Sequence, residues 1–121
     1  MSTHIKILSP TEILEFDRPP EMDFEERRAN FYITNSLNKK LKSLHKPVSK
    51  VGMILQFGYY KHSRKFYKLR NFHLKDIKFI CSLLKLEGEE INIADYRHII
   101  NDHRLIILNL FGHQPFLSTD P

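Results

Sequence analysis

The 121-residue sequence is poor in several residue types that define particular classes of protein. Its one cysteine, Cys81, excludes an intramolecular disulfide, as is usual for an intracellular chain. Only 4 Gly and 6 Pro are present, which excludes collagen-like and low-complexity chains. No apolar run approaches the ~20 residues of a membrane helix, and no signal-peptide pattern opens the chain. These absences predict one folded domain in the cytoplasm with no membrane partner.

Motifs of catalysis and of cofactor binding are also missing. The chain has no phosphate-binding glycine loop, no Gly-x-Ser-x-Gly elbow, no cysteine pair and no His-x-x-x-His with a Glu. One group of residues could be imagined around a tyrosine nucleophile, namely Tyr96, Arg97, His98, His103 and Arg104. Their spacing does not fix them around one reacting atom. We expect no enzyme, catalytic residue, metal, cofactor or small-molecule substrate, and His103 and Cys81 are expected in the core.

Acidic residues are almost missing from the centre of the chain. Residues 1–34 carry 4 basic and 7 acidic residues, residues 35–80 carry 12 and 1, and residues 81–121 carry 3 and 6. The net charge of +5 therefore conceals a block of +11, whose only acid is Asp76. Such a block attracts polyanions, although a solvated face that keeps the protein soluble is the alternative. Aromatic residues interleave with the cations, which favours an anionic partner.

The spacing of apolar residues is helical nearly everywhere and predicts an all-α domain. We expect a compact bundle of five or six short helices, with a helix-turn-helix-like pair near 35–62. The single domain spans 1–121, with an acidic N-terminal part (1–34), a basic core (35–80) and a C-terminal helical part (81–116).

Capping and helix-breaking residues predict where these helices begin and end. Helices are expected from Ser9 to about Phe16, from Asp23, from Thr34 or Asn35, over about 47–62, over about 73–86, and from Asn92 or Asp95 to Phe111. The helix over 73–86 should bury one face made of Leu74, Ile77, Cys81 and Leu84. Gly52 and Gly58 each cost about 1 kcal/mol relative to Ala inside a helix, which predicts the close approach of another helix.

The helix-turn-helix pair suggests which side chains contact DNA. Its second helix would lie in the major groove and expose Ser49, Lys50, Met53, Gln56 and Tyr60. Lys50 and Gln56 are the expected contacts to base edges. The expected phosphate contacts are Lys39, Lys40, Lys42, Lys46, Arg64, Lys65, Lys68 and Arg70. In the connector over 63–72, aromatic rings should anchor the chain while the charges point outward.

Four stretches carry a resemblance to a known family. They are Ile7-Leu8-Ser9-Pro10-Thr11-Glu12, Lys50–Lys61, Arg64-Lys65-Phe66 followed by a helix at 74–86, and Tyr96 with His103-Arg104 and the close from Phe111 to Phe116. Together they resemble the N-terminal DNA-binding region of transposases of the Tn-three family, the replicative transposons. The resemblance implies sequence-specific binding of terminal inverted repeats in DNA transposition, without the catalytic part. The implied partner is double-stranded DNA at transposon ends, and the implied location is the bacterial cytoplasm, at the nucleoid when bound.

A protein-interaction function is the alternative. The chain would then be a regulatory module derived from a truncated transposase, and its basic face would meet an acidic protein such as the full-length transposase. Peripheral membrane binding is disfavoured, because the apolar faces of the basic helices are needed for the core.

Overall fold

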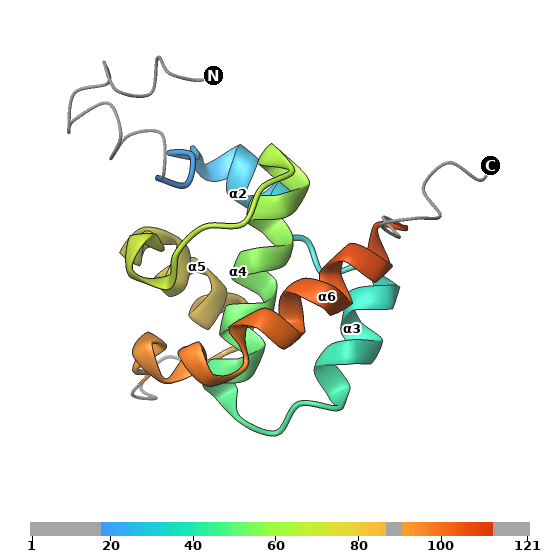
Figure 1. Cartoon of the computed structure of the whole chain (residues 1–121). Helices are drawn as coiled ribbons and strands as arrows, with labels where there is room; N and C mark the ends of the chain where they lie inside the picture. The colour runs from blue at the N-terminus through green and yellow to red at the C-terminus, as the bar shows by residue number, and fades with distance from the viewer. Residues whose placement is uncertain (1–17, 87–90, 113–121) are drawn as a thin grey trace, which may run out of the picture.

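A computed structural model describes residues 18–86 and 91–112, and these residues form a compact bundle of helices with no strand among them (Figure 1). The elements are α2 (Phe24–Asn30), α3 (Asn35–Lys42), α4 (Pro47–Ser63), the 3-10 helix η2 (Leu69–Asn71), α5 (Leu74–Leu83), the 3-10 helix η3 (Ile93–His98) and α6 (Ile100–Leu110). The predicted all-α class is therefore confirmed. The predicted helix from Ser9 to Phe16 lies outside the described residues, which contain no helix long and apolar enough to cross a membrane.

The beginnings of the first described helices follow the sequence signals. Asp23 Oδ1 accepts a hydrogen bond from Glu26 N at 2.8 Å, and Glu26 Oε1 accepts one from Asp23 N at 2.9 Å, which closes a capping box at α2. Thr34 Oγ1 accepts from Leu37 N and caps α3. Pro47 is the first residue of α4, where its missing N–H has no cost.

Helix α4 runs through the centre of the molecule (Figure 1) and packs against α2, α5, α6 and η3. Every residue from 51 to 60 is buried, so this part of the helix is packed on all sides, as is typical of a core helix. The exposure expected of a recognition helix is therefore wrong for four residues. The exposed fractions are 7% for Ser49, 0% for Met53, 1% for Gln56 and 8% for Tyr60. A helix surrounded by packing partners has no free face to place in a DNA groove.

The two glycines of α4 let aromatic rings reach its backbone. A Cβ on Gly52 would overlap the ring of Tyr96, and a Cβ on Gly58 would overlap the ring of Phe31. The predicted close approach to both glycines is confirmed. The groups that approach are the side-chain rings of Tyr96 in η3 and Phe31 at the end of α2, whereas the approach of another helix was predicted.

Replacing Gly52 by alanine tests this packing through the sign of its effect. In an open helix position, Gly→Ala would stabilise by roughly 0.5–1 kcal/mol. Here the added methyl group must displace the Tyr96 ring, which is fully buried. We expect a loss of about 1–3 kcal/mol in the free energy of unfolding, measured by urea denaturation. A gain in stability would contradict the described contact.

Helix α5 buries most of the expected face, since Ile77 is buried and Cys81 and Leu84 pack against the core, but Leu74 lies outside it. Leu74 is 62% exposed, whereas Asp76 is fully buried with Ile77 and Ile80. The reason is a buried polar cluster around the carboxylate of Asp76. Arg27 Nε donates to its Oδ1 at 2.7 Å, and the Tyr59 hydroxyl donates to its Oδ2 at 2.6 Å. Burial, together with the charge of Asp76, raises the pKa of Tyr59 far above its usual range, so the phenol remains a donor.

The C-terminal part begins with a 3-10 helix. Asn92 Oδ1 accepts from Ala94 N at 3.1 Å and caps η3, and α6 follows from Ile100. The expected start of this helical region at Asn92 is confirmed, but the region is divided into η3 and α6. Tyr96 and His103 are both buried, as predicted for the histidine, while Cys81 is half-buried on α5.

Candidate nucleic-acid interface

The surface contributed by residues 35–80 is more positive than the sequence count suggests. The basic residues of this block are all exposed or half-exposed: Lys39, Lys40, Lys42, Lys46, Lys50, Lys61, Arg64, Lys65, Lys68, Arg70, Lys75 and Lys78. The one acid of the block, Asp76, has an exposed fraction of 0% and is paired with Arg27 of α2. The block therefore presents 12 cations and no carboxylate to solvent.

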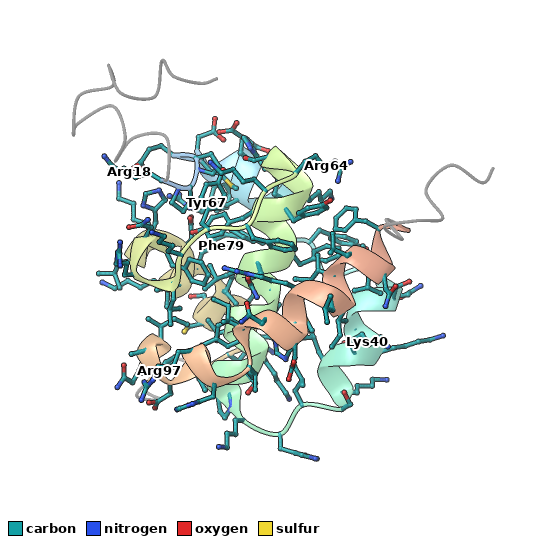
Figure 2. The ribbon with its side chains drawn as sticks, viewed as in Figure 1. Arg18, Lys40, Arg64, Tyr67, Phe79 and Arg97 are labelled. Carbon is teal, nitrogen blue, oxygen red and sulfur yellow. The ribbon has the colours of Figure 1, made fainter. Side chains whose placement is uncertain are left out.

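The first group of predicted contacts lies on α3 and at the start of α4. Lys39, Lys40 and Lys42 are exposed on α3, Lys46 is exposed in the turn, and Lys50 is half-exposed in the first turn of α4. Figure 2 shows Lys40 pointing away from the bundle, on the side opposite Arg97. The helix between Lys46 and Arg64 has 17 residues and is therefore about 26 Å long. The predicted cations are thus distributed over the surface and do not converge on one point.

The second group lies on the connector after α4, whose rings anchor it as predicted. Phe66 stacks on Tyr60 with ring centroids 4.9 Å apart, and Tyr67 is buried. Arg64 stays exposed, with its guanidinium 5.0 Å from the centroid of the Phe111 ring. Lys68 and Arg70 are exposed, and no ion pair joins either to a carboxylate within the described residues.

Gln56, predicted to contact a base, holds another side chain in place. Its Oε1 accepts from Arg104 Nε at 3.0 Å, and its Nε2 donates to Tyr96 Oη at 2.9 Å and to Ile100 O at 3.2 Å. These partners occupy both ends of an amide that is 1% exposed. Gln56 therefore fits a positioning role for Arg104 and not a contact to a base.

The same network continues to a buried histidine. Tyr96 Oη lies 2.6 Å from His103 Nδ1. Burial lowers the pKa of His103, against a smaller opposing effect of Asp102, and so favours the neutral ring. The Tyr96 hydroxyl, whose pKa burial raises, then donates to Nδ1 and accepts from Gln56. Tyr96 Oη thus links Gln56 to His103, and this chain of hydrogen bonds holds the three buried side chains in place.

The lowered pKa of His103 predicts a pH dependence of stability. The unfolded ring takes up a proton as pH falls through its ordinary value near 6.5, and the folded ring does so only at lower pH. Protonation thus favours the unfolded state, so stability should fall below about pH 6.5 by up to about 1.4 kcal/mol per pH unit. Urea titrations at several pH values should show a flatter profile for His103→Gln. Equal slopes for the two proteins would contradict the assignment.

A groove between η2, η3 and α6 gathers cations that are remote in sequence. It has a volume of about 520 Å³ and is lined by Lys68, Leu69, Arg70, Phe72, Ile93, Ala94, Arg97, Ile100 and Arg104. Four of these residues are cations, and none has a carboxylate, amide or hydroxyl group in its side chain. We call this hollow the cationic groove. Arg97 and Arg104 were not among the candidate contacts predicted from the sequence, because they lie outside the basic block.

The sequence that forms this surface matches a family model. A family model described as "Domain of unknown function (DUF4158)" matches residues 7–120. The chain belongs to the DUF4158 family. No curated protein and no solved structure matches the chain. The matched range includes the basic block and all three elements of the cationic groove.

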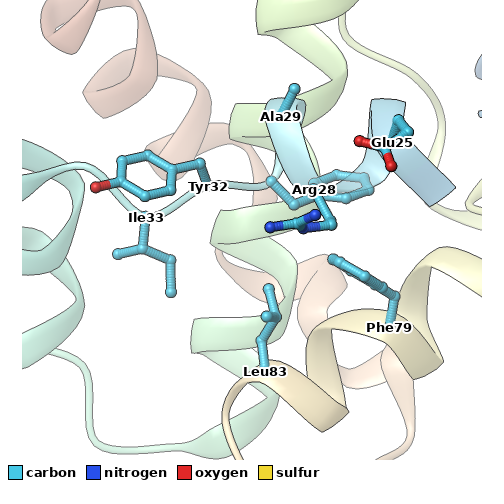
Figure 3. A pocket seen from close by; sticks show the side chains of 8 residues that line it. Glu25, Arg28, Ala29, Tyr32, Ile33, Phe79 and Leu83 are labelled. Carbon is cyan, nitrogen blue, oxygen red and sulfur yellow. The ribbon is translucent and has the colours of Figure 1, made fainter.

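A second hollow of the DUF4158 chain, between α2 and α5, has a different character (Figure 3). Its lining is mostly apolar, with one charge of each sign: Glu25, Arg28, Ala29, Phe31, Tyr32, Ile33, Phe79 and Leu83. A third hollow, near His45 and Lys46, includes the acidic Asp95. Both lack the one-sided charge that suits a polyanion. Within residues 18–86 and 91–112, no group of three or more His, Cys, Asp or Glu side chains could hold a metal ion.

Proposed function

We propose that this DUF4158 domain binds double-stranded DNA through the cations of its 35–80 surface, as the end-recognition module of a transposition protein. The observation that carries the proposal is the burial of Asp76, which leaves 12 cations and no carboxylate on that surface. A duplex carries one negative charge per about 1.7 Å, so a surface of this kind releases counterions when it binds. The chemical step of transposition would belong to another polypeptide region.

The burial of α4 shapes this proposal. Since α4 has no free face, the predicted insertion of a recognition helix is not part of it. Lys50, half-exposed at the start of α4, remains the candidate for a base edge, and the exposed cations on α3 and on the connector are the candidates for phosphates.

The proposal is tested by the salt dependence of duplex binding. About six phosphate contacts predict that the logarithm of the association constant falls with the logarithm of salt concentration at a slope of about −5. Fluorescence anisotropy with a labelled duplex between 50 and 200 mM salt measures this slope. A slope near zero, or no binding at 50 mM salt, would reject DNA binding.

Sequence specificity requires a separate comparison. A duplex that carries a transposon terminal inverted repeat should bind more tightly than a scrambled duplex of equal length and composition. Equal affinities for the two would reject end recognition and leave general polyanion binding. The regulatory alternative, in which the basic face meets an acidic protein, would show weak binding to both duplexes.

As a control, Leu83→Ser in the α2–α5 hollow should leave DNA binding unchanged, because that hollow lies outside the cationic surface.

A further inference from the structure

Arg104, in the wall of the cationic groove, has its guanidinium fixed by neutral oxygens. Its Nε donates to Gln56 Oε1 at 3.0 Å, its Nη2 to Tyr67 O at 2.9 Å and its Nη1 to Asn101 Oδ1 at 3.4 Å. A guanidinium has five N–H donors, so two are left without a partner in the described residues. Three neutral acceptors hold the group in place without neutralising its charge, which leaves it available to an anion.

The neighbouring cations are in a similar state. Arg97 donates from Nη1 to Ala94 O at 3.0 Å and keeps its other donors. No ion pair within the described residues joins a carboxylate to Lys68, Arg70, Arg97 or Arg104. Four like charges around one hollow repel one another, and an anion in the groove would relieve that repulsion.

The floor of the groove supplies a second kind of contact. Leu69, Phe72, Ile93 and Ile100 line it, and these side chains have no hydrogen-bonding groups. The sugar-phosphate backbone of a paired duplex would contact only the exposed cations and would leave the apolar side chains uncovered. A ligand that fills the groove must therefore carry an anionic group and an apolar planar or aliphatic part, and an unpaired nucleotide combines a phosphate with a base that stacks on apolar side chains.

We infer that the cationic groove binds one unpaired nucleotide of the DNA, with its phosphate on the arginines and its base on the apolar floor. This inference rests on the proposed function, because it deepens the way in which the domain contacts DNA. The lining offers no amide or hydroxyl side chain to read base edges. The groove therefore accepts an unpaired base of any identity.

Three labelled duplexes test the inference. One is fully paired, one carries a single-nucleotide bulge, and one carries an abasic bulge that keeps the phosphate and lacks the base. We expect the bulged duplex to bind about tenfold more tightly than the paired duplex, since stacking of one base is worth about this factor or more. The abasic bulge should lose most of the preference. Equal affinities for all three duplexes would overturn the inference.

Variants separate the groove from the rest of the cationic surface. Arg97→Gln and Arg70→Gln remove exposed cations and should reduce the preference for the bulge. Arg104→Lys tests the geometry of the guanidinium, because it keeps the charge while removing the fixed fork. The control Lys39→Gln/Lys40→Gln should weaken binding to all three duplexes by the same factor. If Arg97→Gln weakens binding to all three duplexes by the same factor, the groove does not bind the unpaired nucleotide.

The two hypotheses fail in different ways. Steep salt-dependent binding of the paired duplex without a preference for the bulge rejects the groove and leaves the proposed function standing. Should no duplex bind, a titration with free deoxyadenosine monophosphate, followed by two-dimensional NMR, tests the groove alone. Changes in chemical shift confined to residues around the groove would then show that the groove binds free nucleotides. An unchanged spectrum would reject the groove as a nucleotide site.

Discussion

Asp76→Ala should destabilise the domain by about 3–5 kcal/mol at neutral pH. The substitution removes the partner of Arg27, whose side chain is only 16% exposed, and leaves its charge partly desolvated. It also leaves the Tyr59 hydroxyl, inside the core, without its acceptor. The melting temperature should fall by about 10–20 °C, measured by circular dichroism.

A double-mutant cycle shows whether the pair is responsible. Arg27→Gln combined with Asp76→Asn should cost less than the sum of the two single substitutions, because neither charge then remains buried alone. Asp95→Ala, at an exposed acid of η3, serves as the matched control and should change stability by no more than about 0.5 kcal/mol. A loss below about 1 kcal/mol for Asp76→Ala would contradict the role of the cluster.

Lys39→Gln/Lys40→Gln should weaken duplex binding on the order of 50-fold at 0.1 M salt. Each lost phosphate contact removes about 0.9 from the magnitude of the salt slope, so the slope should become less steep by about 2. Both side chains are exposed on α3, and glutamine has nearly the helix propensity of lysine, so the fold should be retained. Anisotropy titrations at several salt concentrations measure both quantities.

Lys75→Gln/Lys78→Gln is the matched control for this pair. It removes the same charge from α5, whose exposed lysines are outside the predicted contact set. Its effect on the salt slope should be well below that of the α3 pair. Equal effects of the two pairs would mean that net charge alone governs binding and would reject α3 as a contact surface.

Local signals predicted the beginnings of the helices correctly. Asp23, Thr34 and Pro47 act through hydrogen bonds or backbone angles within a few residues of themselves, so the sequence contains all that determines them. Gly52 and Gly58 also indicated close packing, because a helix interior tolerates glycine only with compensation.

Contacts between distant residues were beyond this reasoning. The run from Val51 to Tyr60 is apolar on every side apart from Gln56, which is typical of a buried helix, but its part in the helix-turn-helix pair favoured exposure. The burial of Gln56 depends on Tyr96 and Arg104, which are 40 and 48 residues away in the sequence. The rarity of acids around Asp76 was a usable signal, since a lone carboxylate in a basic block often has a structural partner. The cationic groove forms only when η2 meets η3 and α6.

The central position of α4 has a consequence for the way the chain acquires its structure. Its neighbours lie both before it, at Phe31, and after it, at Tyr96 and Ile107, so the core closes only when contacts across the whole described chain have formed. During synthesis the α3–α4 region leaves the ribosome well before its C-terminal partners. Until those partners arrive, a strongly apolar helix and a dense set of cations are exposed together. Exposed hydrophobic surface of this kind is prone to aggregate, so the time before the C-terminal partners arrive is the vulnerable stage of synthesis.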